Sequence, residues 1–81
     1  MRKVLYDTSL TPLERMTMIY LYSLENENVE ISIKELCELI NCSNKTIIKA
    51  LKRLEETNYL KINKRGQGKN NIYTINYNRG N

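Results

Sequence analysis

The chain has 81 residues, of which 41% are hydrophobic and 27% are charged, and this composition fits one globular domain with one small core. No apolar run approaches the ~20 residues that a transmembrane helix needs. Residues 1–7 also lack the apolar stretch of a signal peptide. We therefore expect a cytoplasmic protein that does not contact a membrane.

The net charge of +4 is distributed unevenly along the chain. Residues 1–42 carry four basic and seven acidic side chains, whereas residues 43–81 carry nine basic and two acidic ones. The later basic residues gather in one stretch with helical spacing and in a second one around Lys64-Arg65-Gly66-Gln67-Gly68-Lys69. Because like charges repel, this crowding indicates a polyanionic partner, and DNA is the leading candidate.

The residue types that carry most enzyme chemistry are absent or dispersed. The chain has no His, and it has no nucleophile motif and no GxxxxGK[ST] phosphate-binding loop. Cys37 and Cys42 are expected to be reduced thiols that pack as small apolar groups. A disulfide would need an oxidising compartment, and two Cys without His make a poor metal site. We expect no catalytic residue, no metal and no cofactor.

The first ten residues are interpreted as an N-terminal extension, and the first helix follows them. Thr11-Pro12-Leu13-Glu14 is a capping box with Pro at the first helical position. Apolar residues then recur at helical spacing and predict a helix over 12–25, namely Leu13, Met16, Tyr20 and Leu24.

Two further caps predict two further helices. Ser32-Ile33-Lys34-Glu35 is a second capping box and predicts a short helix over 33–40. Ser43 is the third cap and predicts a helix over 44–57. The apolar stripe of this last helix consists of Ile47, Ala50, Leu51 and Leu54.

After the third helix the apolar period changes from 3.6 to 2. Asn58 stands where a left-handed residue ends a helix, and Leu60 and Ile62 then alternate with polar residues. A second alternating run around 73–77 follows a polar connection that contains glycine, which predicts a β-hairpin with a long tip. A short strand around Glu30–Ser32 can pair with this hairpin, and residues 78–81 are interpreted as a frayed tail.

The second and third helices are joined by only Asn41-Cys42-Ser43, and so short a connection forces the steep angle of a helix-turn-helix. If the apolar stripe faces the core, the opposite side of the third helix is exposed. That side combines an amide that can bond adenine, lysines that can bond guanine or phosphate, and an Ile that can contact a thymine methyl. Its members are Asn44, Lys45, Ile48, Lys49 and Lys52.

The chain resembles the winged helix-turn-helix domains of bacterial, phage and plasmid regulators and replication proteins. The matching segments are 32–36, the recognition helix 43–55, the strand 60–62 and the returning strand 71–75. The resemblance implies an α+β fold of three helices plus a C-terminal β-hairpin wing, over residues 11–77. It also implies that the recognition helix enters the major groove, with the wing near the DNA backbone or minor groove.

The wing tip has two interpretations. Its glycines either only allow the hairpin to turn, or they also let Lys64, Arg65 and Lys69 reach phosphates or, for Arg65, a narrow minor groove. We favour the second. The predicted DNA-binding residues are Ser43, Asn44, Lys45, Thr46, Ile48, Lys49, Lys52, Lys64, Arg65, Gln67 and Lys69.

The predicted function is binding of double-stranded DNA without enzymatic activity. The role is that of a transcriptional regulator or of an accessory in plasmid or phage replication, partition or conjugative transfer. A module this small contacts few base pairs, so a homodimer or a partner protein is expected. The alternatives are a winged-helix adaptor inside a larger protein complex and a module that binds RNA or single strands.

Overall fold

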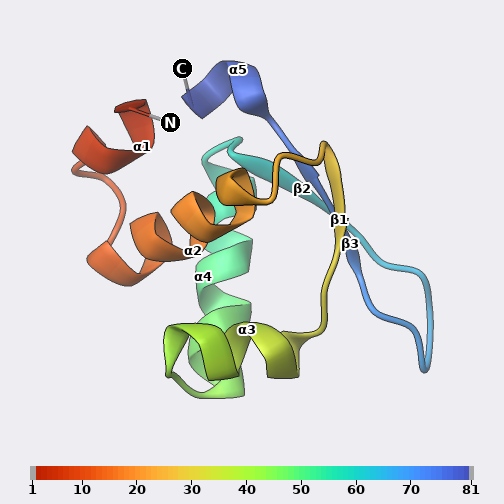
Figure 1. Cartoon of the computed structure of the whole chain (residues 1–81). Helices are drawn as coiled ribbons and strands as arrows, with labels where there is room; N and C mark the ends of the chain where they lie inside the picture. Colours follow the sequence, from red (N-terminus) through yellow and green to blue (C-terminus); the bar gives the residue numbers. More distant parts are fainter. Residues whose placement is uncertain (1, 81) are drawn as a thin grey trace.

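A computed structural model describes residues 2–80 of the chain, whose helices pack on a small antiparallel sheet in an α+β fold (Figure 1). The predicted order α-β-α-α-β-β is confirmed, and a short helix is added at each end. Residues 1 and 81, which belong to the predicted extension and tail, lie outside the described residues. The elements are α1 Arg2–Tyr6, α2 Pro12–Ser23, β1 Asn28–Glu30, α3 Ile33–Ile40, α4 Asn44–Glu56, β2 Leu60–Asn63, β3 Ile72–Ile75 and α5 Tyr77–Gly80.

The three predicted caps define the starts of α2, α3 and α4. Thr11 Oγ1 accepts from the Glu14 backbone N–H at 3.1 Å, and Glu14 Oε1 accepts from the Thr11 N–H at 2.9 Å. Ser32 Oγ accepts from the Glu35 N–H at 3.0 Å, but the reciprocal bond from the Glu35 carboxylate is missing among the described residues. The second capping box is therefore only half formed, and the Glu35 side chain is exposed.

The boundaries differ from the predicted ones by one or two residues. α2 ends at Ser23, two residues early, and α4 ends at Glu56, one residue early. β1 covers Asn28–Glu30 and not Glu30–Ser32, because Ser32 is already the cap of α3. Asn58 has the predicted left-handed backbone, with φ of 67°.

The sheet has the strand order β1-β3-β2, and both pairings are antiparallel. Val29 in β1 and Ile62 in β2 both lie opposite Tyr73, the central residue of the sheet. The hairpin of β2 and β3 with its connecting residues 64–71 is the wing, which extends away from the helices in Figure 1. The predicted pairing of the early strand with the hairpin is confirmed.

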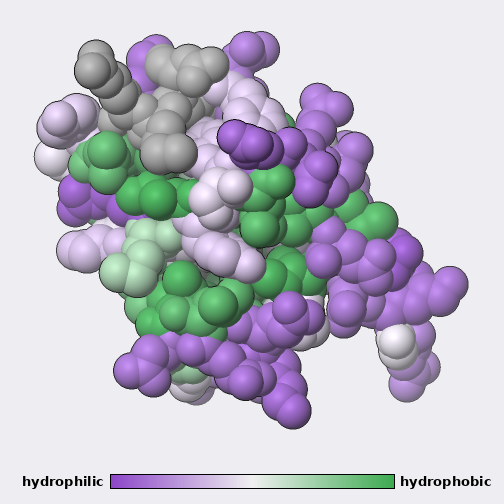
Figure 2. All heavy atoms as spheres, in the orientation of Figure 1, coloured by the Kyte–Doolittle hydropathy of each residue, from purple (hydrophilic) through white to green (hydrophobic). Residues whose placement is uncertain are grey.

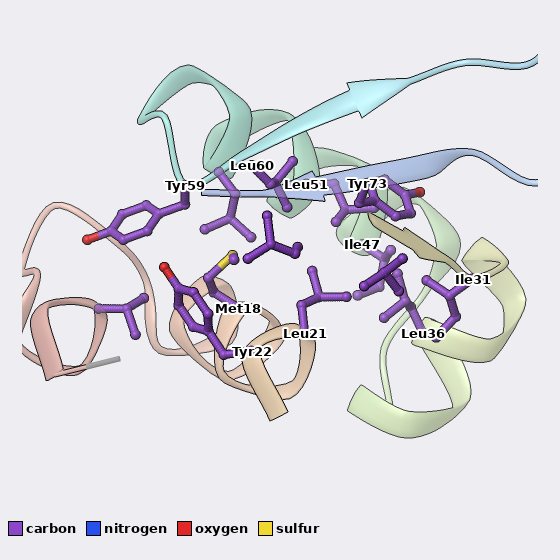
Figure 3. Packing of buried hydrophobic residues seen from close by; sticks show 14 of the residues in the cluster. Met18, Leu21, Tyr22, Ile31, Leu36, Ile47, Leu51, Tyr59, Leu60 and Tyr73 are labelled. Atoms are coloured by element: carbon purple, nitrogen blue, oxygen red, sulfur yellow. The ribbon is translucent and has the colours of Figure 1, made fainter. Parts of the chain in front are cut away.

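The core lies between the helices and one face of the sheet (Figure 3). Leu51 and Leu54 of α4 are buried, as the predicted stripe requires, and Tyr59 and Tyr73 are fully buried beside them. The phenol of Tyr59 donates to Asp7 Oδ2 at 2.6 Å and thereby ties the chain before α2 to the start of β2.

The buried side of α2 only partly overlaps the stripe from which the helix was predicted, since Tyr20 and Leu24 of that stripe pack against the edge of the core. The side chains that reach the core are Thr17, Met18, Leu21 and Tyr22. Met16, part of the periodic stripe used to predict the helix, is 55% exposed. Because the residues on both sides of α2 are largely apolar, the spacing identified the helix but not its buried face.

Both ends of the chain pack on the domain. Val4 and Leu10, from the predicted N-terminal extension, are buried core residues. Residues 78–80 of the predicted frayed tail form α5 together with Tyr77, whose ring lies 5.4 Å from that of Tyr22. Among the described helices, none is both long and apolar enough to span a bilayer.

Candidate nucleic-acid interface

The helix α4 separates its side chains into a buried and an exposed set. Ile47, Ala50, Leu51 and Leu54 are buried against the rest of the domain, which leaves the opposite side of the helix in solvent. α4 contacts both α2 and α3, and it lies behind them in the view of Figure 1. The exposed set contains all five side chains predicted for this side, namely Asn44, Lys45, Ile48, Lys49 and Lys52.

One basic residue of α4 does not belong to the exposed set. Arg53 is half-buried, and its Nη2 donates to the Ser9 carbonyl at 3.3 Å. Its charge is therefore directed at the segment before α2 and not at the side of the helix that carries the lysines. Of the basic residues in α4, only the three lysines therefore contribute to its exposed side.

The turn between α3 and α4 is closed by backbone hydrogen bonds. Asn41 adopts a left-handed conformation with φ of 62°, and the N–H groups of Asn41 and Cys42 donate to the Cys37 carbonyl at 2.8 and 3.1 Å. Asn is the best substitute for Gly at such a position. Burial, and next the neighbouring Cys37, raise the pKa of the Cys42 thiol, and both cysteines are free thiols in the structure.

Ser43 and Thr46, two of the predicted DNA-binding residues, interact with each other at the N-terminal cap of α4. Ser43 Oγ accepts from the Thr46 N–H at 3.2 Å, and the two hydroxyl oxygens lie 2.9 Å apart. Both side chains are exposed. The cap therefore satisfies an N–H group at the start of α4, and this end of the helix is the favourable one for an anion.

Asn44 is the first residue of α4, and its side chain is held from the preceding helix. The Cys37 thiol donates to Asn44 Oδ1 at 3.0 Å. The thiol uses one of the two acceptor positions of the carboxamide oxygen, so the second acceptor position and the NH₂ group remain for an external partner. Sequence reasoning missed this hydrogen bond.

The wing tip exposes the predicted cations around a tight turn. Gly66 and Gly68 have φ of 102° and 79°, which only glycine adopts without strain, and the Lys69 N–H donates to the Gly66 carbonyl at 3.4 Å. A Cβ at either glycine would meet nothing within 4 Å, so backbone conformation and not space requires glycine here. The exposed side chains of this tip include Lys64, Arg65, Gln67 and Lys69.

Arg65 is not free in the wing. Its Nη2 lies 2.7 Å from Glu30 Oε2 in β1, and its Nε donates to the Asn70 carbonyl at 3.0 Å. The two side chains are 36% and 50% exposed, so the ion pair is open to solvent and to competing anions. No local pattern predicts this pair, because its members are separated by 35 positions.

A groove of about 670 Å³ lies between α4 and the wing. Lys52 from α4 and Lys64 from the wing border the same groove, although they come from different elements. Glu55 also lines it, but this carboxylate accepts from the Ile62 N–H at 2.8 Å and so holds the wing against the helix. The remaining lining residues are largely apolar: Ile33, Ile48, Leu51, Ile62, Asn71 and Tyr73.

The chain belongs to a helix-turn-helix domain family, whose model matches residues 8–60. The match begins before α2 and ends at the first residue of β2, so it covers the helix-turn-helix and leaves out most of the wing. No curated protein and no solved structure matches the chain. The winged helix-turn-helix fold is thus supported by both the family and the architecture, and a helix-turn-helix domain points to DNA as the ligand.

Proposed function

We propose that the protein binds double-stranded DNA sequence-specifically, with α4 in the major groove and the wing on the backbone or in the minor groove. One observation carries the proposal: the exposed side of α4 presents Lys45, Lys49 and Lys52, and no acidic residue occurs between Asn44 and Arg53. A positive side on the second helix of a helix-turn-helix is suited to the major groove of DNA.

The proposed DNA contacts divide into two kinds. Lys45, Lys49 and Lys52 supply charge for phosphates, whereas Asn44 and Ile48 supply a donor and an apolar surface for base edges. Ile48 is 53% exposed on a helix whose other large apolar residues are buried, which favours an approach to a thymine methyl.

The wing adds a second set of cations. Lys64 and Lys69 are exposed and suited to phosphates, while Arg65 has to exchange Glu30 for DNA. The groove bordered by Lys52 and Lys64 is then the place where a DNA strand passes between α4 and the wing. Such an arrangement uses both basic stretches of the sequence on one ligand.

The proposed role is non-enzymatic. The protein acts as a transcriptional regulator or as an accessory in plasmid or phage replication, partition or conjugative transfer. The alternative is an adaptor that binds only other proteins. The exposed lysines on both α4 and the wing argue against the adaptor, because such a role does not require them.

The test is selection of bound sites from random duplexes, followed by titration of the selected duplex, a scrambled duplex and the matching single strand. Asn44→Ala should lose about 1–3 kcal/mol on the selected site and lose discrimination there, whereas Lys49→Ala should weaken both duplexes alike. Lys3→Ala, which removes an exposed lysine on α1, is the matched control and should bind like wild type. Equal affinity for all three nucleic acids, or no binding, would contradict the proposal.

A further inference from the structure

The helix α2 has a second apolar side that the domain covers only in part, since Ile19 and Tyr20 pack against the edge of the core while Met16 is exposed. Its core side is occupied by Met18 and Leu21, which are fully buried. On another side, Met16 is 55% exposed, and Ile19 and Tyr20 are only partly buried. These three residues are spaced i, i+3, i+4 and therefore lie together on the helix surface.

This side continues onto the neighbouring helices. Leu5 of α1 is 45% exposed and Leu39 of α3 is 54% exposed. Two shallow hollows connect these residues to α2. The first, of about 320 Å³, includes Leu5, Arg15, Met16 and Ile19, and the second, of about 340 Å³, includes Tyr20, Glu35, Glu38 and Leu39. We call these eight residues the α2 face. Figure 2 shows apolar surface along this side, from the region of α1 to that of α3.

The exposed apolar side chains are concentrated here. Among the described residues, the exposed large hydrophobic side chains are Leu5, Tyr6, Met16, Leu39 and Ile48, and only Ile48 lies on α4. Single exposed apolar residues are ordinary on protein surfaces, but a continuous group of them marks an interaction surface.

The charges at the two ends of the α2 face are opposite. Arg15 borders the hollow near α1, and Glu35 and Glu38 border the hollow near α3. Within residues 3–78, the ion pair that forms is Arg65 with Glu30, so Arg15, Glu35 and Glu38 have no ionic partner among those residues. A surface with an apolar centre, a basic end and an acidic end is complementary to itself after a two-fold rotation.

We propose that the α2 face binds a second copy of this chain about a two-fold axis. The axis passes between Met16 and Tyr20 of α2, so that Met16 of one copy meets Tyr20 of the other. Arg15 of each copy then lies beside Glu35 and Glu38 of the other. The same surface serves both copies, as a closed two-fold dimer requires.

The proposed dimer leaves the exposed side of α4 accessible to DNA. α2 contacts the buried side of α4, so its outer face points away from the exposed lysines. A two-fold pair of helix-turn-helix domains would bind two half-sites and would extend the few base pairs that one copy contacts. Only the binding of two half-sites rests on the proposed function, because dimerisation itself is measured in the absence of DNA.

The test is sedimentation equilibrium of the full chain without DNA over a wide concentration range. The wild-type mass should rise from 9.6 kDa towards twice that value. Met16→Glu should raise the dimer dissociation constant by about tenfold or more, because it buries an unpaired carboxylate in the apolar centre of the interface. Ile48→Glu makes the same kind of change at a side chain of similar exposure on α4 and should leave the constant unchanged.

A charge exchange tests the predicted arrangement. Arg15→Glu and Glu38→Arg should each weaken the dimer, and the double variant should restore it towards the wild-type constant. Arg15 Nη1 also donates to the Leu5 carbonyl at 3.0 Å, so thermal melts are needed to confirm that each variant folds. If Arg15→Glu unfolds, the neutral Arg15→Gln replaces it in the test. A wild-type mass of one copy at all concentrations, or a dimer indifferent to Met16→Glu, would overturn the proposal. Either result leaves the DNA-binding proposal standing.

Discussion

The thiol of Cys37 in α3 donates a hydrogen bond to the carboxamide oxygen of Asn44, the first residue of α4, at 3.0 Å. Bidentate recognition of adenine needs both the oxygen and the NH₂ group of an Asn. The thiol takes one of the two lone pairs of that oxygen, so Asn44 keeps one acceptor position and both NH₂ donors for a base or a phosphate. The hydrogen bond therefore helps to orient the Asn44 carboxamide without removing its ability to accept.

Asn44→Asp should separate folding from DNA binding. A carboxylate in the first turn of α4 interacts favourably with the helix dipole, so stability should stay equal or rise by about 0.3–1 kcal/mol. Duplex affinity should fall, because the outward donor is replaced by a charge that repels phosphate. Urea unfolding and anisotropy titration measure the two effects. The control is Asn26→Asp, which makes the same charge change in the exposed loop before β1. If Asn44→Asp binds DNA as well as this control, Asn44 is not part of the interface.

Glu30→Gln should strengthen DNA binding by releasing Arg65. Glu30 holds Arg65 at 2.7 Å in an exposed ion pair, and such pairs contribute roughly 0–1 kcal/mol to stability. Stability should therefore change little, whereas duplex affinity should rise because Arg65 no longer has to leave Glu30 to reach a phosphate, with the slope of log K against log salt unchanged. In the Arg65→Ala background, Glu30→Gln should lose most of this effect. Weaker binding by Glu30→Gln would show that Arg65 needs Glu30 to be correctly placed.

Leu54→Ala should destabilise the domain by about 2–5 kcal/mol, because Leu54 is completely buried and its truncation leaves a cavity. Ile48→Ala on the same helix is the control, since Ile48 is 53% exposed and its truncation should cost far less. Chemical unfolding of both variants at one protein concentration provides the comparison. Similar losses of stability in the two variants would mean that α4 is rotated from the orientation described above.

Stability should fall at alkaline pH because of Tyr73. Burial raises the pKa of Tyr73, whereas the unfolded chain keeps the ordinary value of about 10. The stabilising contribution is therefore fully present below about pH 10 and is lost as the pH rises through the higher folded pKa. Urea melts from about pH 8 to pH 11 should show a steeper decline for wild type than for Tyr73→Phe. Parallel declines would show that Tyr73 ionises equally in both states.

The sequence predicts the buried side of α4 well and that of α2 less well. The difference lies in how the apolar residues are distributed around each helix. α4 has one apolar side and one charged side, so periodicity determines both its existence and its orientation. α2 is apolar around much of its circumference, so the stripe through Met16 identifies the helix but not its buried side. Met16, the exposed member of that stripe, lies in the proposed dimer surface.

Other features cannot be obtained from local patterns. α1 and α5 have five and four residues, too few for a periodic signal. The pair of Arg65 with Glu30 and the groove between Lys52 and Lys64 depend on how distant segments meet. The bond between Cys37 and Asn44 depends on the left-handed turn at Asn41, which a sequence pattern suggests only after the helix boundaries are known.

The central claim is that one DNA duplex touches both α4 and the wing, and a salt titration tests it most directly. The slope of log K against log salt should become shallower by about 0.9 for each phosphate that the protein no longer neutralises. Lys45→Ala/Lys49→Ala and Lys64→Ala/Lys69→Ala should therefore each reduce the slope by roughly 2, with melting temperatures near wild type. An unchanged slope in either folded double variant would contradict the account, because that pair of lysines would then have no part in binding.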